Sequence, residues 1–183
     1  MESRCLKLDP SFEDDISHLY LSAFPDDERP PLDWFYKCLY KYKENEVIGY
    51  FDENEFIGFV EITTYKDIIY IVFFAIIENK RNQGYGTKIL SDIKEKYSNF
   101  TILLCYEEVS EKYPDYENRK HRQDFYLRNG FIDNEMKTRE GDVVYQSAYI
   151  GKCKVSFEEY QNIFDLCYGT GASKTYLREY KNL

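Results

Sequence analysis

A glycine-containing loop that follows a long apolar segment is the part of this chain best suited to bind a charged ligand. The run Ile68–Ile77 is almost entirely apolar, and the residues Arg81-Asn82-Gln83-Gly84-Tyr85-Gly86 follow it. A strand that leads through such a loop into a helix leaves unpaired backbone N–H groups at the helix N-terminus, where the helix dipole also favours an anion. Glycine lets the backbone approach that anion closely, and Arg81 could pair with a phosphate. The pattern therefore predicts a phosphate-binding loop.

Two nucleotide-binding patterns do not fit this loop. A dinucleotide-binding fingerprint would need a third glycine where Ile89 stands. A P-loop would need Gly-Lys followed by Ser or Thr, which does not occur here. The structural alternative is that Gly84 and Gly86 only shape a tight turn.

A second group of residues, Phe125-Tyr126-Leu127-Arg128-Asn129-Gly130-Phe131, contains a tyrosine that could act as a proton donor. A phenol with a pKa of about 10 is protonated at neutral pH and can give its proton to a leaving group. The alternative for Tyr126 is an aromatic side chain that only packs at a helix end.

A site with a proton donor can also need a side chain that accepts a proton from the reacting partner. The candidate carboxylates are Glu28, Glu61 and Glu107, each of which could instead be an ordinary solvated side chain. Glu28 is preferred, because the loop Phe24–Pro31 around it is rich in proline and charge and too stiff for a simple connector. His121 is expected in solvent at a polar helix start.

Hydrophobic periodicity and turn residues predict the elements that position these groups. Ser11 is expected to cap the first helix and Ser156-Phe157-Glu158-Glu159 to open the last one as a capping box. The expected strands are Arg4–Leu8, Val47–Phe51, Phe56–Thr64, Ile68–Ile77, Thr101–Tyr106, Ile132–Thr138 and Val143–Ile150. The expected helices run from Ser11 to about Ala23, from Pro31 to about Tyr40, from the glycine loop to about Tyr97, up to Asn129-Gly130, and from Ser156 to about Cys167.

The Arg-x-x-Gly-x-Gly loop after an apolar strand, followed by Phe-Tyr-x-x-x-Gly-Phe at the end of the next helix, resembles the GNAT superfamily of acyl-CoA-dependent N-acetyltransferases. The resemblance extends over Arg4–Ile150. It implies an α/β (α+β) fold with a single mixed, mostly antiparallel sheet, helices on both faces, and the order βααβββαβαββ plus a C-terminal helix. We therefore expect an acetyltransferase domain over residues 1–150 and a C-terminal helical extension over 151–183, packed on the same domain.

The resemblance also implies a co-substrate and roles for individual residues. Acetyl-CoA would place its pyrophosphate on the amides from Arg81 to Thr87, and its pantetheine arm would pair with backbone near Ala75 and Ile76. Tyr126 matches the family tyrosine that protonates the departing thiolate. The residues expected to bind acetyl-CoA are Ala75, Ile76, Arg81, Asn82, Gln83, Gly84, Tyr85, Gly86, Thr87 and Asn118, and those expected to act in catalysis are Tyr126 and Glu28.

The expected function is transfer of acetyl from acetyl-CoA to a primary amine, by direct attack. The net charge of −9 and the carboxylates near the expected groove favour a cationic acceptor, either a small molecule or a peptide amine. One alternative is a non-catalytic acyl-CoA-binding regulatory module on the same fold. Another is a protein-interaction domain in which the glycine loop is structural.

The amino-acid composition argues against several other functional classes of protein. The acidic balance argues against nucleic-acid binding, and five scattered cysteines with two histidines make a metal site improbable. The N-terminus has no signal-peptide core and the longest apolar run is too short to span a bilayer, so we expect a cytoplasmic protein with reduced thiols and no membrane partner. The segment after Ile150 could cover the acceptor site or form a homodimer contact, and the sequence leaves both roles open.

Overall fold

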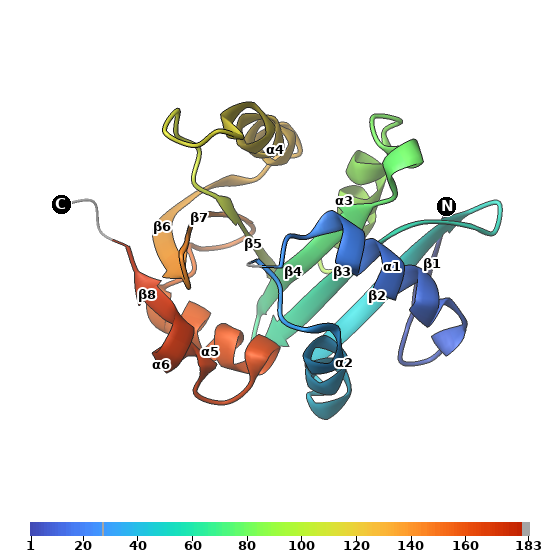
Figure 1. Ribbon diagram of the computed structural model, residues 1–183, viewed down its shortest axis with the longest axis horizontal. Helices are drawn as coiled ribbons and strands as arrows, with labels where there is room; N and C mark the ends of the chain where they lie inside the picture. Colours follow the sequence, from blue (N-terminus) through green and yellow to red (C-terminus); the bar gives the residue numbers. More distant parts are fainter. Residues whose placement is uncertain (27, 181–183) are drawn as a thin grey trace.

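The computed structural model describes residues 1–26 and 28–180, which form one eight-stranded sheet flanked by helices (Figure 1). The strands are β1 (Glu2–Cys5), β2 (Asn45–Asp52), β3 (Glu55–Tyr65), β4 (Ile68–Ile76), β5 (Thr101–Glu107), β6 (Ile132–Glu140), β7 (Val143–Ile150) and β8 (Leu177–Glu179). The helices are α1 (Glu13–Ala23), α2 (Leu32–Lys41), α3 (Tyr85–Lys96), α4 (Tyr116–Arg128), α5 (Phe157–Tyr168) and α6 (Ala172–Tyr176), with 3-10 turns η1 (Pro10–Phe12) and η2 (Glu78–Lys80).

The strand order is β1-β2-β3-β4-β5-β7-β6-β8. Among the described strands, β4 and β5 form the parallel pair and all other neighbours are antiparallel. The helix α3 connects the two parallel strands, as a crossover between parallel neighbours requires. The expected mixed, mostly antiparallel sheet is confirmed.

Helices cover both faces of the sheet. On one face α3 and α4 bury Ile89, Leu90, Ile93 and Tyr126 against the apolar side chains of β2 to β5. On the other face α1 and α2 cover the N-terminal strands and α5 covers the C-terminal ones. The helices α2 and α5 contact each other along that second face and lie side by side in Figure 1.

Two N-terminal expectations are wrong in detail. The first strand is Glu2–Cys5 rather than Arg4–Leu8, because the backbone N–H groups of Leu8 and Asp9 both turn back to the Cys5 carbonyl. Ser11 does not cap the first helix: the Asp9 carboxylate accepts from the Ser11 amide and caps a short 3-10 turn ahead of α1.

The C-terminal segment contains more structure than the sequence indicated. The capping box at Ser156 is confirmed, with both of its reciprocal hydrogen bonds to Glu159 present. After α5 the chain forms the short helix α6 and the strand β8, which pairs with β6 and completes the sheet. The division of the chain at Ile150 stays a prediction. In the part of the chain that the structure describes, no helix has the length and apolar character needed to cross a bilayer.

Candidate functional site

The strands β4 and β5 pair only at one end and then separate. Ile68–Ile71 pairs with Thr101–Leu104, although β4 continues to Ile76 and β5 to Glu107. The separation begins at a β-bulge, since Glu61 of β3 faces Phe73 while Ile62 faces Ile71, which leaves Val72 as an extra residue in β4. A cavity of about 410 Å³ lies between the separated strands and is lined by Phe73–Ile76 of β4 and by Leu104, Cys105 and Glu107 of β5. We call it the central cavity.

The predicted phosphate-binding loop borders a second cavity, of about 640 Å³. We call it the loop cavity; its wall comprises Arg81, Asn82, Gly84, Gly86 and Thr87 on one side and Arg122, Tyr126 and Arg128 of α4 on the other. Gly84 precedes the first turn of α3 with a φ of 83°, a left-handed conformation that favours glycine. The first turn of α3 contains no acidic residue. Its free amides and the surrounding arginines suit an anion such as a diphosphate.

Two residues of the predicted loop direct their side chains elsewhere. The Gln83 side-chain amide donates to the Asn79 carbonyl at 2.7 Å, and the Tyr85 hydroxyl donates to the Asp52 carboxylate at 2.8 Å. Only the backbone amides of Gln83 and Tyr85 therefore remain as candidate ligand contacts.

Gly86 is needed for helix packing rather than for backbone flexibility. A Cβ at this position would lie 2.9 and 3.1 Å from ring atoms of Phe125 on α4. The absence of a side chain thus lets the N-terminus of α3 approach α4 closely. Phe125 and Gly86 together set the width of the loop cavity between the two helices.

Beyond Ile71 the edge of β4 that faces β5 has no partner among the described strands, and the backbone N–H and C=O groups of alternate residues point toward it. The Ile77 N–H donates to the Ile57 carbonyl of β3 at 3.0 Å, so strand alternation directs the backbone groups of Ala75 toward β3 as well. The groups of Phe74 and Ile76 face the opposite way, and the Ile76 carbonyl accepts from Arg81 Nε at 3.0 Å. Of the two residues predicted to pair with the pantetheine arm, Ile76 has its backbone on the open edge. Ala75 lines the central cavity but turns its backbone to β3.

Tyr126 stands where the central cavity and the loop cavity meet, and it lines both. Its ring lies 5.8 Å from that of Tyr106 and 6.0 Å from that of Phe131, which fixes its position at the end of α4. Burial raises the pKa of the Tyr126 hydroxyl above its ordinary value. The phenol is therefore protonated at neutral pH, as a proton donor must be.

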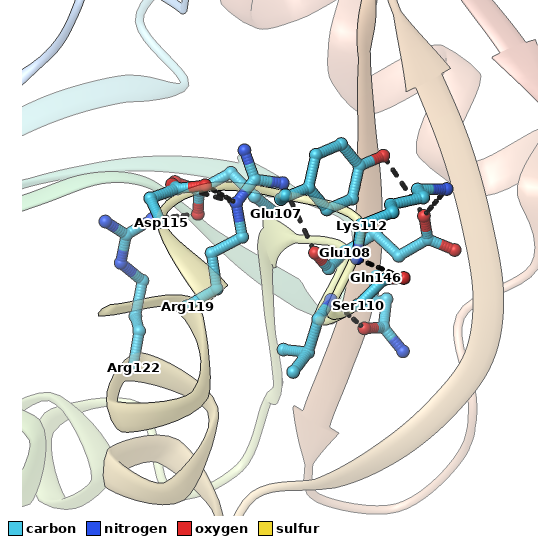
Figure 2. Close-up of polar contacts among 10 residues, drawn as sticks. Glu107, Glu108, Ser110, Lys112, Asp115, Arg119, Arg122 and Gln146 are labelled. Carbon is cyan, nitrogen blue, oxygen red and sulfur yellow. Dashed lines mark hydrogen bonds and ion pairs between the residues drawn. The ribbon is translucent and has the colours of Figure 1, made fainter. Parts of the chain in front are cut away.

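Ion pairs hold the segment between β5 and α4 in place, as Figure 2 shows. Arg119 donates to both oxygens of Asp115 at 2.9 Å and to the Glu108 carbonyl at 3.2 Å. Glu108 also accepts from Lys112 at 2.6 Å and from Lys137 at 3.1 Å. This network anchors the first turn of α4 to the end of β5.

Glu107 and Asn118 lie at the two ends of this segment, and the structure shows the environment of each. Glu107 is buried at the end of β5 and is ion-paired with Arg122 of α4 (Figure 2), so its charge is already compensated. Asn118 lies inside the first turn of α4, and its exposed side chain lines the central cavity. Glu61 is buried beneath β3 on the face covered by α1, α2 and α5 and is not among the residues that line these cavities.

Glu28 lies on the opposite side of the central cavity and also lines a third cavity, of about 490 Å³. We call this one the aromatic cavity; its walls include Trp34, Tyr145, Phe164, Tyr168 and Tyr176, together with Glu28, Glu140 and Arg29, whose guanidinium is ion-paired with Asp26. Glu28, Glu140, Tyr145 and Tyr168 line both it and the central cavity. The three cavities thus adjoin one another through shared lining residues, from the N-terminus of α3 to the side chains of α2 and α5.

Residues 13–131 match the model of a family described as the acetyltransferase (GNAT) family. The chain belongs to this family. The GNAT assignment agrees with the resemblance seen in the two sequence motifs and identifies the protein as an acyltransferase. Among curated protein sequences, none matches the chain.

Solved structures share the GNAT fold. A protein from Bacteroides thetaiotaomicron assigned to the GNAT family superimposes with a TM-score of 0.77 at 22% identity, covering 92% of this chain and 99% of its own. The aminoglycoside 6'-N-acetyltransferase from Enterococcus faecium gives a TM-score of 0.62 at 14% identity, covering 83% and 99%. The ribosomal-protein-S18-alanine N-acetyltransferase from Escherichia coli also gives 0.62, at 12% identity, covering 85% and 96%. At these identities the likeness establishes the fold.

Sequence reasoning about this GNAT site missed Glu140, Tyr145 and Tyr168. A signal for Glu140 exists, because the buried residues of β6 alternate as Asn134, Met136 and Thr138, and Glu140 continues that inward series. The approach of Tyr145 and Tyr168 to Glu28 has no local signal, since it depends on how α5 packs beside the N-terminal helices.

Proposed function

We propose that the chain transfers an acetyl group from acetyl-CoA to a primary amine. The observation that supports this most is the separation of β4 and β5, which opens the central cavity between the N-terminus of α3, proposed to bind the diphosphate, and the third cavity with its two carboxylates. Tyr126 lies at the junction nearest the glycine loop, and Glu28 and Glu140 lie at the other end. Donor and acceptor would thus meet in the central cavity from opposite sides.

The loop cavity and the edge of β4 would hold acetyl-CoA. Its diphosphate suits the amides from Arg81 to Thr87, with the guanidinium groups of Arg81 and Arg128 nearby. The open backbone edge at Ile76 suits the amides of an extended pantetheine arm, which could pair there as an added strand. Asn118 borders the central cavity, where a polar contact to that arm is within its reach. Acetyl-CoA supplies the activated acetyl group.

Tyr126 would act as the general acid. As the amine nitrogen bonds to the acetyl carbon, the carbon–sulfur bond breaks and the departing thiolate needs a proton. The Tyr126 hydroxyl is buried at the junction of the central and loop cavities and is protonated at neutral pH. Direct transfer of this kind needs no covalent enzyme intermediate.

The acceptor would be a cationic small molecule or a peptide amine. The carboxylates of Glu28 and Glu140 are the acidic groups at the acceptor end of the site, and the chain as a whole is acidic. An ammonium attracted to these carboxylates must lose a proton before it can attack the acetyl group. Glu28 is therefore proposed to act on the acceptor side, as the sequence suggested.

Calorimetric titration with acetyl-CoA tests the donor site. We expect micromolar binding to the wild type and about tenfold weaker binding to Arg81→Ala, because one charge-assisted contact is lost. Lys96→Ala, which removes a positive charge at the far end of α3, should bind like the wild type. Equal melting temperatures of the two variants would show that a loss in Arg81→Ala is not an effect of unfolding.

Absence of binding to the wild type would contradict both the enzyme and the acyl-CoA-binding alternative. Binding without CoA release from any member of a panel of primary amines would instead favour the non-catalytic regulatory module. CoA release should be followed by chromatography, because exposed Cys153 would react with a thiol reagent.

A further inference from the structure

The aromatic cavity is built mainly by helices outside the two GNAT motifs. Trp34 comes from α2, Tyr145 from β7, Phe164 and Tyr168 from α5, and Tyr176 from α6. The indole N–H of Trp34 donates to the Tyr168 carbonyl at 3.1 Å, which ties α2 to the end of α5. A cavity with five aromatic walls favours a flat, apolar body.

Charge is concentrated where the aromatic cavity meets the central cavity. Glu28 and Glu140 line both cavities and come from different parts of the chain, the loop after α1 and the end of β6. Tyr145 and Tyr168 line the same junction. A ligand whose body fills the aromatic cavity would therefore place its end group between two carboxylates, beside the space for the acetyl donor.

Hydroxyl donors fix the orientation of the Glu140 carboxylate. Its Oε1 accepts from the Tyr160 hydroxyl at 2.7 Å and from the Thr138 hydroxyl at 3.1 Å. Tyr160 is fully buried, and its oxygen lies 3.0 Å from the hydroxyl of Tyr70 on β4. Because Tyr160 donates to Glu140, Tyr70 must donate to Tyr160, and the three groups form a directed chain. Burial also raises the pKa of Glu140 to about 7, a value suited to accepting a proton near neutral pH.

We propose that the aromatic cavity binds a primary alkylammonium whose chain bears an aromatic ring, and that Glu140 receives the proton which this ammonium must lose before acetyl transfer. The proposal rests on the proposed function and names the acceptor class and the proton acceptor of that same site. Glu28 then binds the ammonium by its charge. The aromatic walls contact the ring and add cation–π attraction near the charged end.

The proton balance of the step is complete with these groups. One ammonium proton passes to the Glu140 carboxylate and later leaves to solvent. The neutral nitrogen forms a bond to the acetyl carbon, and the carbon–sulfur bond breaks with its electron pair on sulfur. Tyr126 gives its proton to that sulfur, and the extra proton on the acylated nitrogen returns through solvent to the Tyr126 oxygen. The products are the amide, CoA and one released proton.

The inference gives the segment after Ile150 one of the two roles that the sequence left open. Three of the five aromatic walls, Phe164, Tyr168 and Tyr176, belong to it, and so does Tyr160, which orients Glu140. These residues lie beyond residue 131, where the family match ends. The segment would thus cover the acceptor and select it.

Trp34 is the single tryptophan of the chain and lines the aromatic cavity, so its fluorescence responds to a ligand bound there. Trp34 also lines a neighbouring cavity to which Glu140 does not contribute, so the Glu140→Gln variant distinguishes the two sites. The probe is 2-phenylethylamine, titrated at pH 8 without acetyl-CoA. Its neutral analogue 2-phenylethanol and the aliphatic n-butylamine are the ligand controls. Glu140→Gln is compared with Asp142→Asn, which removes an exposed carboxylate from the turn next to it.

We expect 2-phenylethylamine to quench the fluorescence of Trp34 in a saturable way. Both control ligands should bind about tenfold more weakly than this probe. The probe should in turn bind about tenfold more weakly to Glu140→Gln than to the wild type. Asp142→Asn should bind like the wild type. Tyr176→Ala, at a largely exposed position that should not disturb folding, is expected to weaken the binding of 2-phenylethylamine but not that of n-butylamine.

Equal affinity for 2-phenylethylamine and 2-phenylethanol, or unchanged binding by Glu140→Gln, would contradict the proposal that the carboxylates between the two cavities bind the ammonium. Equal affinity for 2-phenylethylamine and n-butylamine would overturn the aromatic acceptor class. The titration contains no acetyl-CoA, so these failures are distinguishable from failure of the proposed function, which the donor titration measures separately.

Discussion

The hydroxyl of Tyr126 carries the most specific prediction at the scale of a single residue. Tyr126→Phe keeps the ring that packs against Tyr106 and Phe131 and removes only the proton donor. We expect turnover to fall about 10²-fold or more, since general acid catalysis contributes that much, while the dissociation constant of acetyl-CoA stays within about twofold. Steady-state kinetics with an active amine and calorimetry with acetyl-CoA measure the two quantities. A parallel loss of both would mean that Tyr126 is a packing residue.

Glu140 leads to a prediction about the pH dependence of activity. Its pKa is raised to about 7 by burial, and the hydrogen bond from Tyr160 opposes that rise. The activity kcat/KM for 2-phenylethylamine should therefore increase as pH rises through about 7, because the carboxylate must be ionised to accept a proton. The titratable and charged groups around Glu140 are Glu28 and Arg29 of the loop after α1, Tyr70 of β4, Cys105 of β5, Tyr145 of β7, and Tyr160, Cys167 and Tyr168 of α5.

Tyr160→Phe tests whether Tyr160 positions and tunes this carboxylate. Losing a hydrogen bond to the ionised form raises the pKa, so the midpoint of the acidic limb should move to higher pH by roughly one unit. Tyr70→Phe removes only the hydroxyl behind Tyr160 and should shift the midpoint less, in the same direction. A lower rate with an unmoved midpoint would assign Tyr160 a purely structural role.

At the scale of elements, the contact between α3 and α4 depends on one missing methyl group. Gly86→Ala would place a Cβ against the Phe125 ring, and overpacking of this kind lowers the free energy of unfolding by about 1–3 kcal/mol. Adding Phe125→Leu should restore part of the loss, and a denaturant double-mutant cycle measures the coupling. Ser91→Ala, at an exposed position of the same helix, is the control. A neutral Gly86→Ala would show that the two helices can move apart freely.

Elements with a strong local signal could be predicted from the sequence, and those stabilised by distant partners could not. The apolar runs of β4 and β5 and the capping box at Ser156 were found because their determinants are neighbouring residues. The strand β8 has three residues and exists through pairing with β6, so no local pattern reveals it. The Ser11 cap was misassigned because Asp9 caps a 3-10 turn that contains Ser11, so Ser11 does not stand at the start of α1.

Some residues of the candidate site could likewise be predicted from the sequence, and others could not. The glycine loop and Tyr126 were found from motifs, and the structure brings Arg81, Gly84 and Tyr126 to one cavity. The ion pair between Glu107 and Arg122 could not be predicted from the sequence, because it joins the end of β5 to α4.

At the scale of the whole molecule, a buried carboxyl makes global stability depend on pH. Glu61 is 3% exposed, one of its carboxyl oxygens lacks a hydrogen-bond partner among the described residues, and burial raises its pKa to about 8. The titratable and charged groups around it are Lys7, Tyr20 of α1, Cys38 of α2, and Cys167 and Tyr168 of α5.

Because the folded state favours the protonated form, the stability linked to Glu61 is fully present below pH about 4.5 and is lost as pH rises to about 8. By pH 7 the loss is on the order of 3 kcal/mol. Glu61→Gln should therefore gain stability over the wild type as pH rises from 5 to 8, in denaturant unfolding curves. Glu95→Gln, which changes an exposed glutamate of α3, should follow the wild type at every pH. Parallel curves for Glu61→Gln and the wild type would show that this carboxyl is not buried as described.

The extra residue in β4 also constrains how the length of this strand can change. Ile69 and Ile71 face α3, whereas Phe73 and Ala75 beyond the bulge join the core beneath α1 and α2. Val72 packs on the same face as Phe73, so deleting it would leave Ile71 and Phe73 as direct neighbours on opposite faces, and every later side chain would keep its present face. The aromatic core beneath α1 and α2 would therefore survive the deletion. What would be lost is the bulge itself, and with it the point at which β4 leaves β5, so shortening the strand by this one residue should close the gap that exposes the edge at Ile76.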